Sequence, residues 1–272
     1  MDISEINFNM DINLVEKNII KDVKAIILVH LYGQSCDISK IKNIAKRKSI
    51  TLIEDCSQAH GAMYKNKIVG GFGDFGIFSF YPTKNLATLG DAGFITTNND
   101  KFYRKIIKLR EYGWNEERVS ELHGKNSRMD EIHAAILNIQ LKNLDKNNDI
   151  RRKIANYYNE SFKSIDLVTP ANNSFSKHVY HQYVVQLENR DELKIFLEKN
   201  KIYPGIHYHT PAHQMKAYKK FYKNELPVTN SVKKRILSLP IHSGLRKKDA
   251  ELVIKNVKKF FNRKDEKKFK KN

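Results

Sequence analysis

Residues 25–58, with the sequence AIILVHLYGQSCDISKIKNIAKRKSITLIEDCSQ, decide the fold of the chain. They begin with a short apolar run, residues 25–30, which leads to a glycine turn at Gly33 and predicts a buried strand. Asp37 then precedes apolar positions spaced as on one face of a helix, and residues 50–53 form a second apolar run. The order strand, helix, strand predicts a right-handed βαβ unit with two parallel strands.

Polar residues follow the second predicted strand. In βαβ units, functional groups collect where the strands end at their carboxyl side. This rule places Glu54, Asp55 and Gln58 at the edge of a site.

A third and a fourth strand are predicted further along the chain. A glycine-rich turn precedes residues 75–80, which have the composition of a strand, and Pro82 ends that strand. Another strand pattern covers residues 93–97. Lys84 lies in the turn that connects the two strands.

Two helices are expected to follow. Asp100 is placed to cap the first, which extends to Glu111, and Ser127 is placed to cap the second. The second helix carries apolar residues at helical spacing as far as Leu141.

The character of the chain changes near Pro170. Beyond it, the pattern predicts a strand at 180–187, a helix at 191–199, a strand at 201–206 and later helices ending near Phe261. The final residues, 262–272, are mostly charged and are predicted to be disordered.

The composition limits the classes of partner. The formal net charge is +19, but only 11 of the 49 basic residues are Arg, and the Lys residues are scattered rather than set in one stripe. We therefore expect a solvated surface that attracts anionic small molecules, and no nucleic acid partner.

Membrane, secretory and metal classes also lack support. No apolar run is long enough to cross a bilayer and no secretory signal is present, so we expect a cytoplasmic protein with no membrane partner. Cys36 and Cys56 lack the spacing of a zinc site and make a poor disulfide framework. Both are expected to be reduced and structural, and no metal site is predicted.

Asp55 and Lys84 together indicate pyridoxal phosphate chemistry. This cofactor needs a Lys amine for a Schiff base and a carboxylate that keeps its pyridine nitrogen protonated. Ser79, five residues before Lys84 and at a strand end, offers a hydroxyl to a phosphate group. Each residue alone is weak evidence, and the joint arrangement carries the interpretation.

The chain resembles the DegT/DnrJ/StrS family of sugar aminotransferases over residues 1–261. The motifs that carry the resemblance occur in family order and are VHLYG at 29–33, EDCSQAHGA at 54–62, FSFYPTKNL at 78–86, GDAG at 90–93, GKNSRMDE at 124–131 and GIHY at 205–208. It implies an α/β protein of the pyridoxal-phosphate-dependent transferase fold type I. Its parts would be a cofactor-binding large domain with a mixed sheet (1–165), a smaller α+β domain (166–261) and the basic tail (262–272).

The resemblance also implies roles for single residues. Lys84 would bind the cofactor covalently and shuttle a proton, Asp55 would pair with the pyridine nitrogen, and Gln58 would lie close to the ring. Ser79 would bind the phosphate. Asn126 would reach the cofactor phosphate of the partner subunit, because in this family the site lies at a homodimer interface.

The substrate implied by the resemblance is a nucleotide-linked keto-sugar. Several motifs are similar to enzymes that aminate C3 of dTDP-3-keto-6-deoxyhexoses for amino-sugar and surface polysaccharide biosynthesis, with glutamate as amino donor. Tyr81, His207 and Tyr208 would lie near the hexose. Val119 stands where such relatives often carry a Tyr, so one hydroxyl near the sugar differs from them.

Several alternatives stay open. Family members have a further upstream segment with a Ser-Gly-Thr phosphate loop, so the chain is expected to lose sheet strands and cofactor affinity. The alternative to an active aminotransferase is an inactive truncated fragment or a non-catalytic relative of the same fold, and a separate polypeptide supplying the missing segment is a further alternative. Dehydratase relatives carry His in place of the Schiff-base Lys, which Lys84 argues against, and nothing in the motifs supports a nucleic-acid-binding module. His60 and Arg128 are read as structural residues.

Overall fold

The predicted βαβ unit is present in the computed structural model, which describes residues 1–222 and 225–269. Strands β1 (Ala25–Val29) and β2 (Thr51–Asp55) are parallel, and α2 (Ile38–Lys48) connects them. Asp37 occupies the position before α2, but its carboxylate accepts a hydrogen bond from Tyr64 Oη at 2.7 Å instead of capping the helix.

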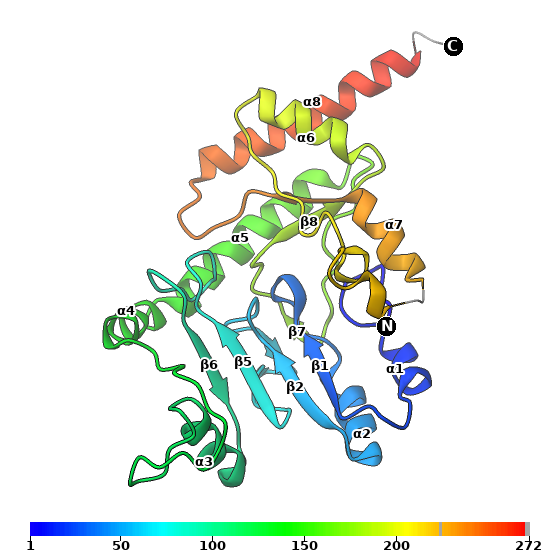
Figure 1. Cartoon of the computed structure of the whole chain (residues 1–272). Helices are drawn as coiled ribbons and strands as arrows, with labels where there is room; N and C mark the ends of the chain where they lie inside the picture. The colour runs from blue at the N-terminus through cyan, green and yellow to red at the C-terminus, as the bar shows by residue number, and fades with distance from the viewer. Residues whose placement is uncertain (223–224, 270–272) are drawn as a thin grey trace.

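The unit extends into a mixed four-stranded sheet with the order β1-β2-β5-β6 (Figure 1). Strand β5 (Phe75–Ser79) runs parallel to β2, and β6 (Gly93–Thr96) runs antiparallel to β5. Because β1, β2 and β5 are parallel, their carboxyl ends lie at the same edge of the sheet. The expectation of an α/β fold with a mixed sheet is confirmed.

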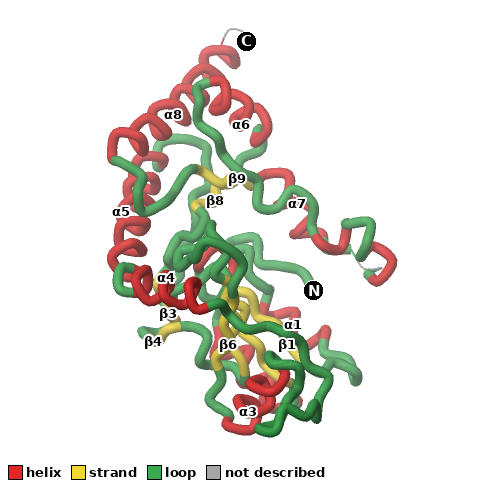
Figure 2. The backbone as a smooth tube through the Cα atoms, turned by 60° about the vertical axis from the view of Figure 1, so that its left-hand side comes forward, coloured by secondary structure: helices red, strands yellow, loops and turns green. Residues whose placement is uncertain are grey.

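The C-terminal part has its own layer of strands and helices. Strand β8 (Tyr183–Gln186) pairs antiparallel with β9 (Ile236–Leu239), and every residue of both strands is buried. Helices α5 (Leu144–Phe162), α6 (Arg190–Lys199) and α8 (Lys247–Phe269) lie around this pair (Figure 2).

The remaining elements are short or peripheral. They are α1 (Ile12–Asn18), α3 (Asp100–Leu109), α4 (Glu131–Leu141), α7 (Pro227–Arg235), the strands β3 (Met63–Tyr64), β4 (Lys67–Ile68) and β7 (Ser176–Lys177), and the 3₁₀ turns η1 (Leu31–Gly33), η2 (Ala212–Gln214) and η3 (Lys219–Phe221).

Apolar residues gather in two main cores, one in each part of the chain. One core surrounds the β1–α2–β2 unit and includes Leu28 and Ile41, while the other surrounds β8 and β9 and includes Tyr183 and Leu237. The second half of α5 packs into the latter core. The division of the chain at residue 165 stays a prediction.

Two predicted helix starts are wrong. Asn99 caps α3, because its side-chain oxygen accepts from the N–H groups of Lys101 and Phe102, so Asp100 is already inside the helix. Helix α4 begins at Glu131 after Asp130, since Ser127 donates its backbone N–H to Arg110 in the preceding loop.

Two predictions on the C-terminal part are also wrong. Residues 201–206 form no strand but make a single bridge, Gly205 to Ser238, and Pro204 within this stretch has no backbone N–H to donate to a ladder. Residues 262–269 continue α8 instead of being disordered, because extending an existing helix avoids the cost of nucleating one. The rest of the predicted tail, 270–272, lies outside the described residues.

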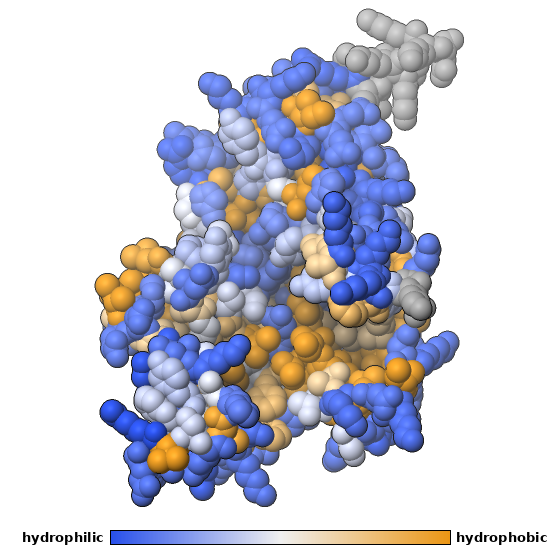
Figure 3. Space-filling model, in the orientation of Figure 1, coloured by the Kyte–Doolittle hydropathy of each residue, from blue (hydrophilic) through white to orange (hydrophobic). Residues whose placement is uncertain are grey.

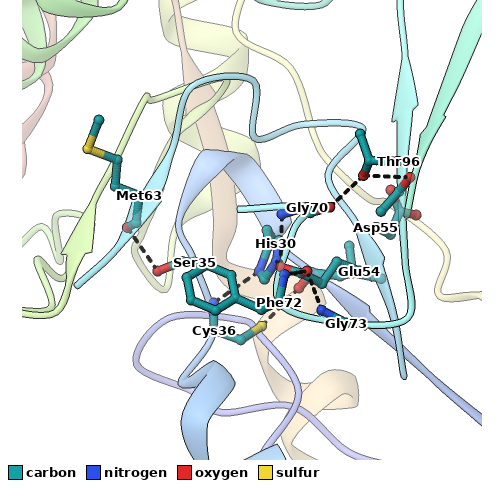
Figure 4. A network of polar contacts seen from close by, with 12 residues as sticks. His30, Ser35, Cys36, Glu54, Asp55, Met63, Gly70, Phe72, Gly73 and Thr96 are labelled. Carbon is teal, nitrogen blue, oxygen red and sulfur yellow. Dashed lines mark hydrogen bonds and ion pairs between the residues drawn. The ribbon is translucent and has the colours of Figure 1, made fainter. Parts of the chain in front are cut away.

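A buried carboxylate holds the glycine-rich turn after β4 against the sheet (Figure 4). Glu54 Oε1 accepts from the backbone N–H groups of Phe72 (2.7 Å) and Gly73 (2.8 Å), and Oε2 accepts from that of Gly70 (2.9 Å). His30 Nε2 lies 3.2 Å from Oε2. Because His30 Nδ1 accepts from the N–H of Cys36, the ring proton is on Nε2 and points at Glu54.

Glycine is required in this turn for steric reasons. A Cβ on Gly73 would lie 2.6 Å from the carbonyl oxygen of Leu52, and Gly70 has a φ of +96°. The turn therefore approaches β2 as closely as only a residue without a side chain allows.

One face of the sheet carries exposed apolar side chains. Ile27 on β1 and Ile95 on β6 share this face, and they are 53% and 47% exposed. Figure 3 shows apolar surface gathered over the sheet in the lower half of the molecule. Within 1–222 and 225–269, no helix has both the length and the apolar character needed to span a membrane.

We predict that Glu54→Gln lowers the free energy of unfolding by about 3 kcal/mol. The amide nitrogen cannot accept, so at least one buried backbone N–H is left without its acceptor. Urea unfolding followed by circular dichroism measures the change.

Glu117→Gln, at an exposed carboxylate, is the matched control and is expected to be near neutral. Burial raises the pKa of Glu54, but the hydrogen bonds from His30, Gly70 and Gly73 outweigh it and the net pKa is lowered. The stabilisation is therefore present above the ordinary Glu range and is lost as pH falls through the folded pKa. Equal acid sensitivity of the two variants would contradict this role.

Candidate active site

The carboxyl edge of the sheet brings the predicted cofactor residues together. Asp55 ends β2 and Ser79 ends β5, and these two strands are neighbours. The chain then turns at Phe80, whose backbone N–H donates to Ala92 and whose carbonyl accepts from Thr88. Lys84 is carried on this loop, above the strand ends.

Lys84 has the electrostatic surroundings of a reactive amine. Burial disfavours its ammonium form and lowers its pKa, while the charge of Asp55 acts in the opposite direction, and the net pKa is lowered. The Asp55 carboxylate is oriented by the backbone N–H of Ser57, which donates to Oδ1 at 2.9 Å. A less basic amine lies near a fixed carboxylate, as the sequence predicts.

Gln58 connects the sheet edge to the C-terminal part of the chain. Its Oε1 accepts from the backbone N–H of Tyr32 at 2.7 Å, and its Nε2 donates to Tyr208 Oη at 2.9 Å. The side chain of Tyr32 in turn donates to the carbonyl of His207. Two of the predicted sugar-binding residues are thus tied to a predicted cofactor residue.

His207 is fixed from the opposite side as well. Its Nδ1 lies 2.8 Å from Ser238 Oγ on β9, and burial lowers its pKa. Tyr208, by contrast, is 53% exposed beyond its bond to Gln58. The pair offers a neutral imidazole and an accessible phenol beside the sheet edge.

Three predicted site residues are exposed or make weaker contacts than Asp55, Gln58 and His207. Ser79 Oγ makes a long contact, 3.4 Å from the backbone nitrogen of Tyr81, and Tyr81 is 49% exposed. Asn126 forms a bridge with Glu111 next to α3 and is exposed. Over the described residues, no hydrogen bond joins Asn126 to the other predicted site residues.

Glu54 does not belong to this site, contrary to the sequence-based placement. Successive side chains of a strand point to opposite faces, so Asp55 faces the site and Glu54 faces the core. The guanidinium of Arg128 donates to Glu111 Oε1 at 2.8 Å, and its structural role stays a prediction.

His60 is fully buried beside the site and packs between two aromatic rings. Its ring centroid lies 5.7 Å from that of Phe78 and 5.6 Å from that of Phe80. Burial and the charge of Lys84 lower the pKa of His60 to about 4. The ring is therefore neutral and adds no positive charge next to the Lys84 amine.

Sequence reasoning missed residues that pack around the Lys84 loop. Asn85 and His181 are in contact, and Asn148 bonds to Asn85 from helix α5. Asn85 follows Lys84 directly in the sequence, and this position could have identified it as a residue of the site. Asn148 had no such signal, since no helix was expected at its position.

The donor set fits pyridoxal phosphate. An amine with a lowered pKa suits the aldehyde, a fixed carboxylate suits the ring nitrogen, and a hydroxyl at a neighbouring strand end suits the phosphate. All three project from one edge of the sheet.

Comparison with known proteins gives the same assignment. Residues 1–258 match the model of the DegT/DnrJ/EryC1/StrS aminotransferase family. The chain belongs to this family. Its aminotransferases are pyridoxal-phosphate-dependent enzymes, so this is the cofactor of the site and the chain is an aminotransferase by family.

Individual relatives refine the comparison. The dTDP-3-amino-3,6-dideoxy-alpha-D-galactopyranose transaminase of Aneurinibacillus thermoaerophilus is 41% identical over 93% of this chain and 70% of its own. The UDP-N-acetyl-3-dehydro-alpha-D-glucosamine 3-aminotransferase of Acidithiobacillus ferrooxidans is 38% identical over 90% and 67%. The solved structure of Streptomyces venezuelae DesV, in complex with a ketimine intermediate, matches with a TM-score of 0.92 and 35% identity over 95% and 70%.

These relatives support the aminotransferase fold and a class of reaction, but no single substrate. The family assignment and the relatives' names support amino transfer to nucleotide-linked keto-sugars as the reaction class. The expected fold type, family and cofactor are confirmed, whereas the roles of the single residues stay predictions.

We predict that borohydride treatment of the protein loaded with pyridoxal phosphate fixes the cofactor to Lys84. Lys84→Arg keeps a positive charge but removes the primary amine, so it is expected to abolish covalent labelling. Peptide mapping by mass spectrometry identifies the labelled residue. Lys65→Arg, at an exposed lysine, is the control and should label as the wild type does; cofactor recovered on another lysine would overturn the assignment.

Proposed function

We propose that this chain transfers the amino group of glutamate to C3 of a dTDP-linked 3-keto-6-deoxyhexose, as a homodimer. The observation that carries the proposal is the Lys84–Asp55 pair at the carboxyl edge of the sheet, with its lowered amine pKa. The family membership and the nucleotide-sugar names of the relatives support the same reaction class.

Asp55 and Lys84 divide the chemistry between them. When bound, pyridoxal phosphate supplies a protonated pyridine ring that withdraws electrons. Asp55 would hold a proton on the ring nitrogen, and the hydrogen bond from the N–H of Ser57 keeps its carboxylate oriented. Burial makes the Lys84 amine less basic. Its Nζ atom would therefore accept a proton as general base and return it as general acid.

The sugar is proposed to lie between the strand edge and the 205–208 segment. His207 and Tyr208 are held there by Ser238 and Gln58, and Tyr81 exposes its hydroxyl beside the Lys84 loop. The net charge of +19 favours the approach of a nucleoside diphosphate. The dTDP preference rests on the 41%-identical relative, while the UDP-sugar relative makes UDP the competing nucleotide.

A second copy is proposed to complete the phosphate site. Asn126 is exposed and lies outside the bonded group around Asp55 and Gln58, so its amide is available to another chain. This arrangement gives each dimer two sites built from both subunits.

We predict that Asp55→Asn retains covalently bound cofactor but lowers the rate of amino transfer by about 100-fold or more, since a neutral amide does not hold the ring proton. The measurement uses glutamate as donor and a panel of dTDP- and UDP-linked 3-keto-hexoses as acceptors. Ping-pong kinetics are expected, because the donor product leaves before the sugar binds.

Asp100→Asn, at an exposed carboxylate, is the control for this experiment. Unchanged turnover in Asp55→Asn would remove Asp55 from its role. Transfer to UDP-sugars alone would replace the nucleotide in the proposal, and no transfer to any keto-sugar by the wild type would reject it.

We predict that Asn126→Ala and Lys84→Ala proteins, each inactive alone, regain activity when mixed and reassembled. One site of each mixed dimer then combines an intact Lys84 with an intact Asn126. Size-exclusion chromatography confirms dimers, and amino transfer measures the recovery. Confirmed mixed dimers without recovery would show that each subunit builds its own site.

A further inference from the structure

The Lys84 loop is held by an amide and imidazole network. Asn85, the residue after Lys84, donates from Nδ2 to Asn148 Oδ1 at 2.9 Å and to the carbonyl of Val179 at 3.1 Å. Its Oδ1 lies 3.2 Å from His181 Nδ1. Asn148 Nδ2 in turn donates to the carbonyl of His60 at 2.9 Å. One side chain next to Lys84 thus contacts two distant segments.

Two backbone carbonyls fix the direction of every bond in this network. A carbonyl only accepts, so the oxygen of Val179 requires the nitrogen of Asn85 to face it, and the oxygen of His60 does the same for Asn148. The oxygen of Asn85 is then left for His181. His181 Nδ1 must therefore carry a proton and donate.

Asn85 is half-buried, and its two side-chain partners are buried and closely packed. Asn148 is 1% exposed and His181 is 7% exposed. A Cβ on Gly61, which follows His60, would lie 2.8 Å from Asn148 Nδ2. A buried polar group that loses its partner is costly, so these residues hold one arrangement rather than several.

Resting on the proposed function, we propose that Asn85, held by Asn148 and His181, is a positioning residue that fixes the direction in which the Lys84 amine meets the cofactor. A lysine side chain has several rotatable bonds, and its backbone must be fixed if its amine is to reach one place. The hydrogen bond from the N–H of Lys84 to Tyr81 holds only the near side of the loop. Asn85 holds the far side.

The protonation of His181 agrees with this role. Burial is the main cause that lowers its pKa, to about 3, and the charges of Lys84 and Arg151 act in the same direction. A neutral ring has one nitrogen that donates and one that does not. The bond to Asn85 selects Nδ1 as the donor, and no positive charge is added beside the Lys84 amine.

The first experiment uses nitrogen NMR of the cofactor-free protein. His181 is expected to be the Nδ1–H tautomer in the wild type and to change toward the Nε2–H tautomer in Asn85→Ala. This measurement needs neither cofactor nor substrate, so it tests the network separately from the proposed function. A wild-type Nε2–H tautomer would overturn the inference.

The second experiment measures the loaded protein. Asn85→Ala is expected to reduce the induced circular dichroism of the cofactor band at equal covalent occupancy, because the ring is held less firmly. It is also expected to lower kcat by about tenfold or more while KM for the sugar changes much less. His181→Leu should act in the same way. His181→Asn should restore both signals, since its amide nitrogen takes the place of Nδ1.

Tyr183→Phe is the control for lost stability alone. It removes the bond to Asn159 at 2.6 Å in the C-terminal core and leaves the network intact. Equal melting temperatures of Tyr183→Phe and Asn85→Ala, with a dichroism change only in the latter, support positioning. Unchanged dichroism and kcat in Asn85→Ala would reject the positioning role of Asn85. A wild-type protein without amino transfer would reject the proposed function, but the dichroism experiment would still test the positioning role.

Discussion

The site depends on the hydrogen bonds that the buried Glu54 carboxylate accepts. The carboxylate accepts three backbone N–H groups from the 70–73 turn and faces the Nε2 proton of His30, all without contact with water. A buried charge of this kind is tolerated only when its hydrogen bonds are complete. The turn leads directly into β5, so the same bonds fix the strand that carries Ser79 and the loop that carries Lys84.

The neighbouring residue, Asp55, uses the other face of the same strand. Pleating sends adjacent side chains in opposite directions, so one carboxylate stabilises the core while the next one faces the site. The two acids therefore serve different purposes although they share a chemistry and a strand. Gln58, three residues after Asp55 and outside the strand, connects the same edge of the sheet to Tyr208.

The local pattern of the sequence was enough for the sheet and for the central residues of the site. Apolar runs and a helical spacing identified β1, α2 and β2, and the carboxyl-end rule placed Asp55 at the edge of the sheet, although it placed Glu54 there as well. It was not enough for contacts between distant segments. The carboxylate of Glu54 and the network around Asn85 depend on which backbone groups the fold brings within hydrogen-bonding distance, and no residue spacing encodes that. Helix α5 was missed because its polar residues, such as Asn148 and Arg151, are buried by partners elsewhere in the chain.

Helix α5 also has a mechanical consequence. Leu144 at its start packs with Phe80 and Leu86 on either side of the Lys84 loop, and Phe162 at its end packs in the C-terminal core. Nineteen helical residues form a stiff rod of about 28 Å. A hinge between the two parts of the chain therefore cannot lie inside α5. A movement of the C-terminal part must bend the segments that flank α5, or it must tilt α5 as a whole. In the second case the start of the helix displaces the loop that carries Lys84.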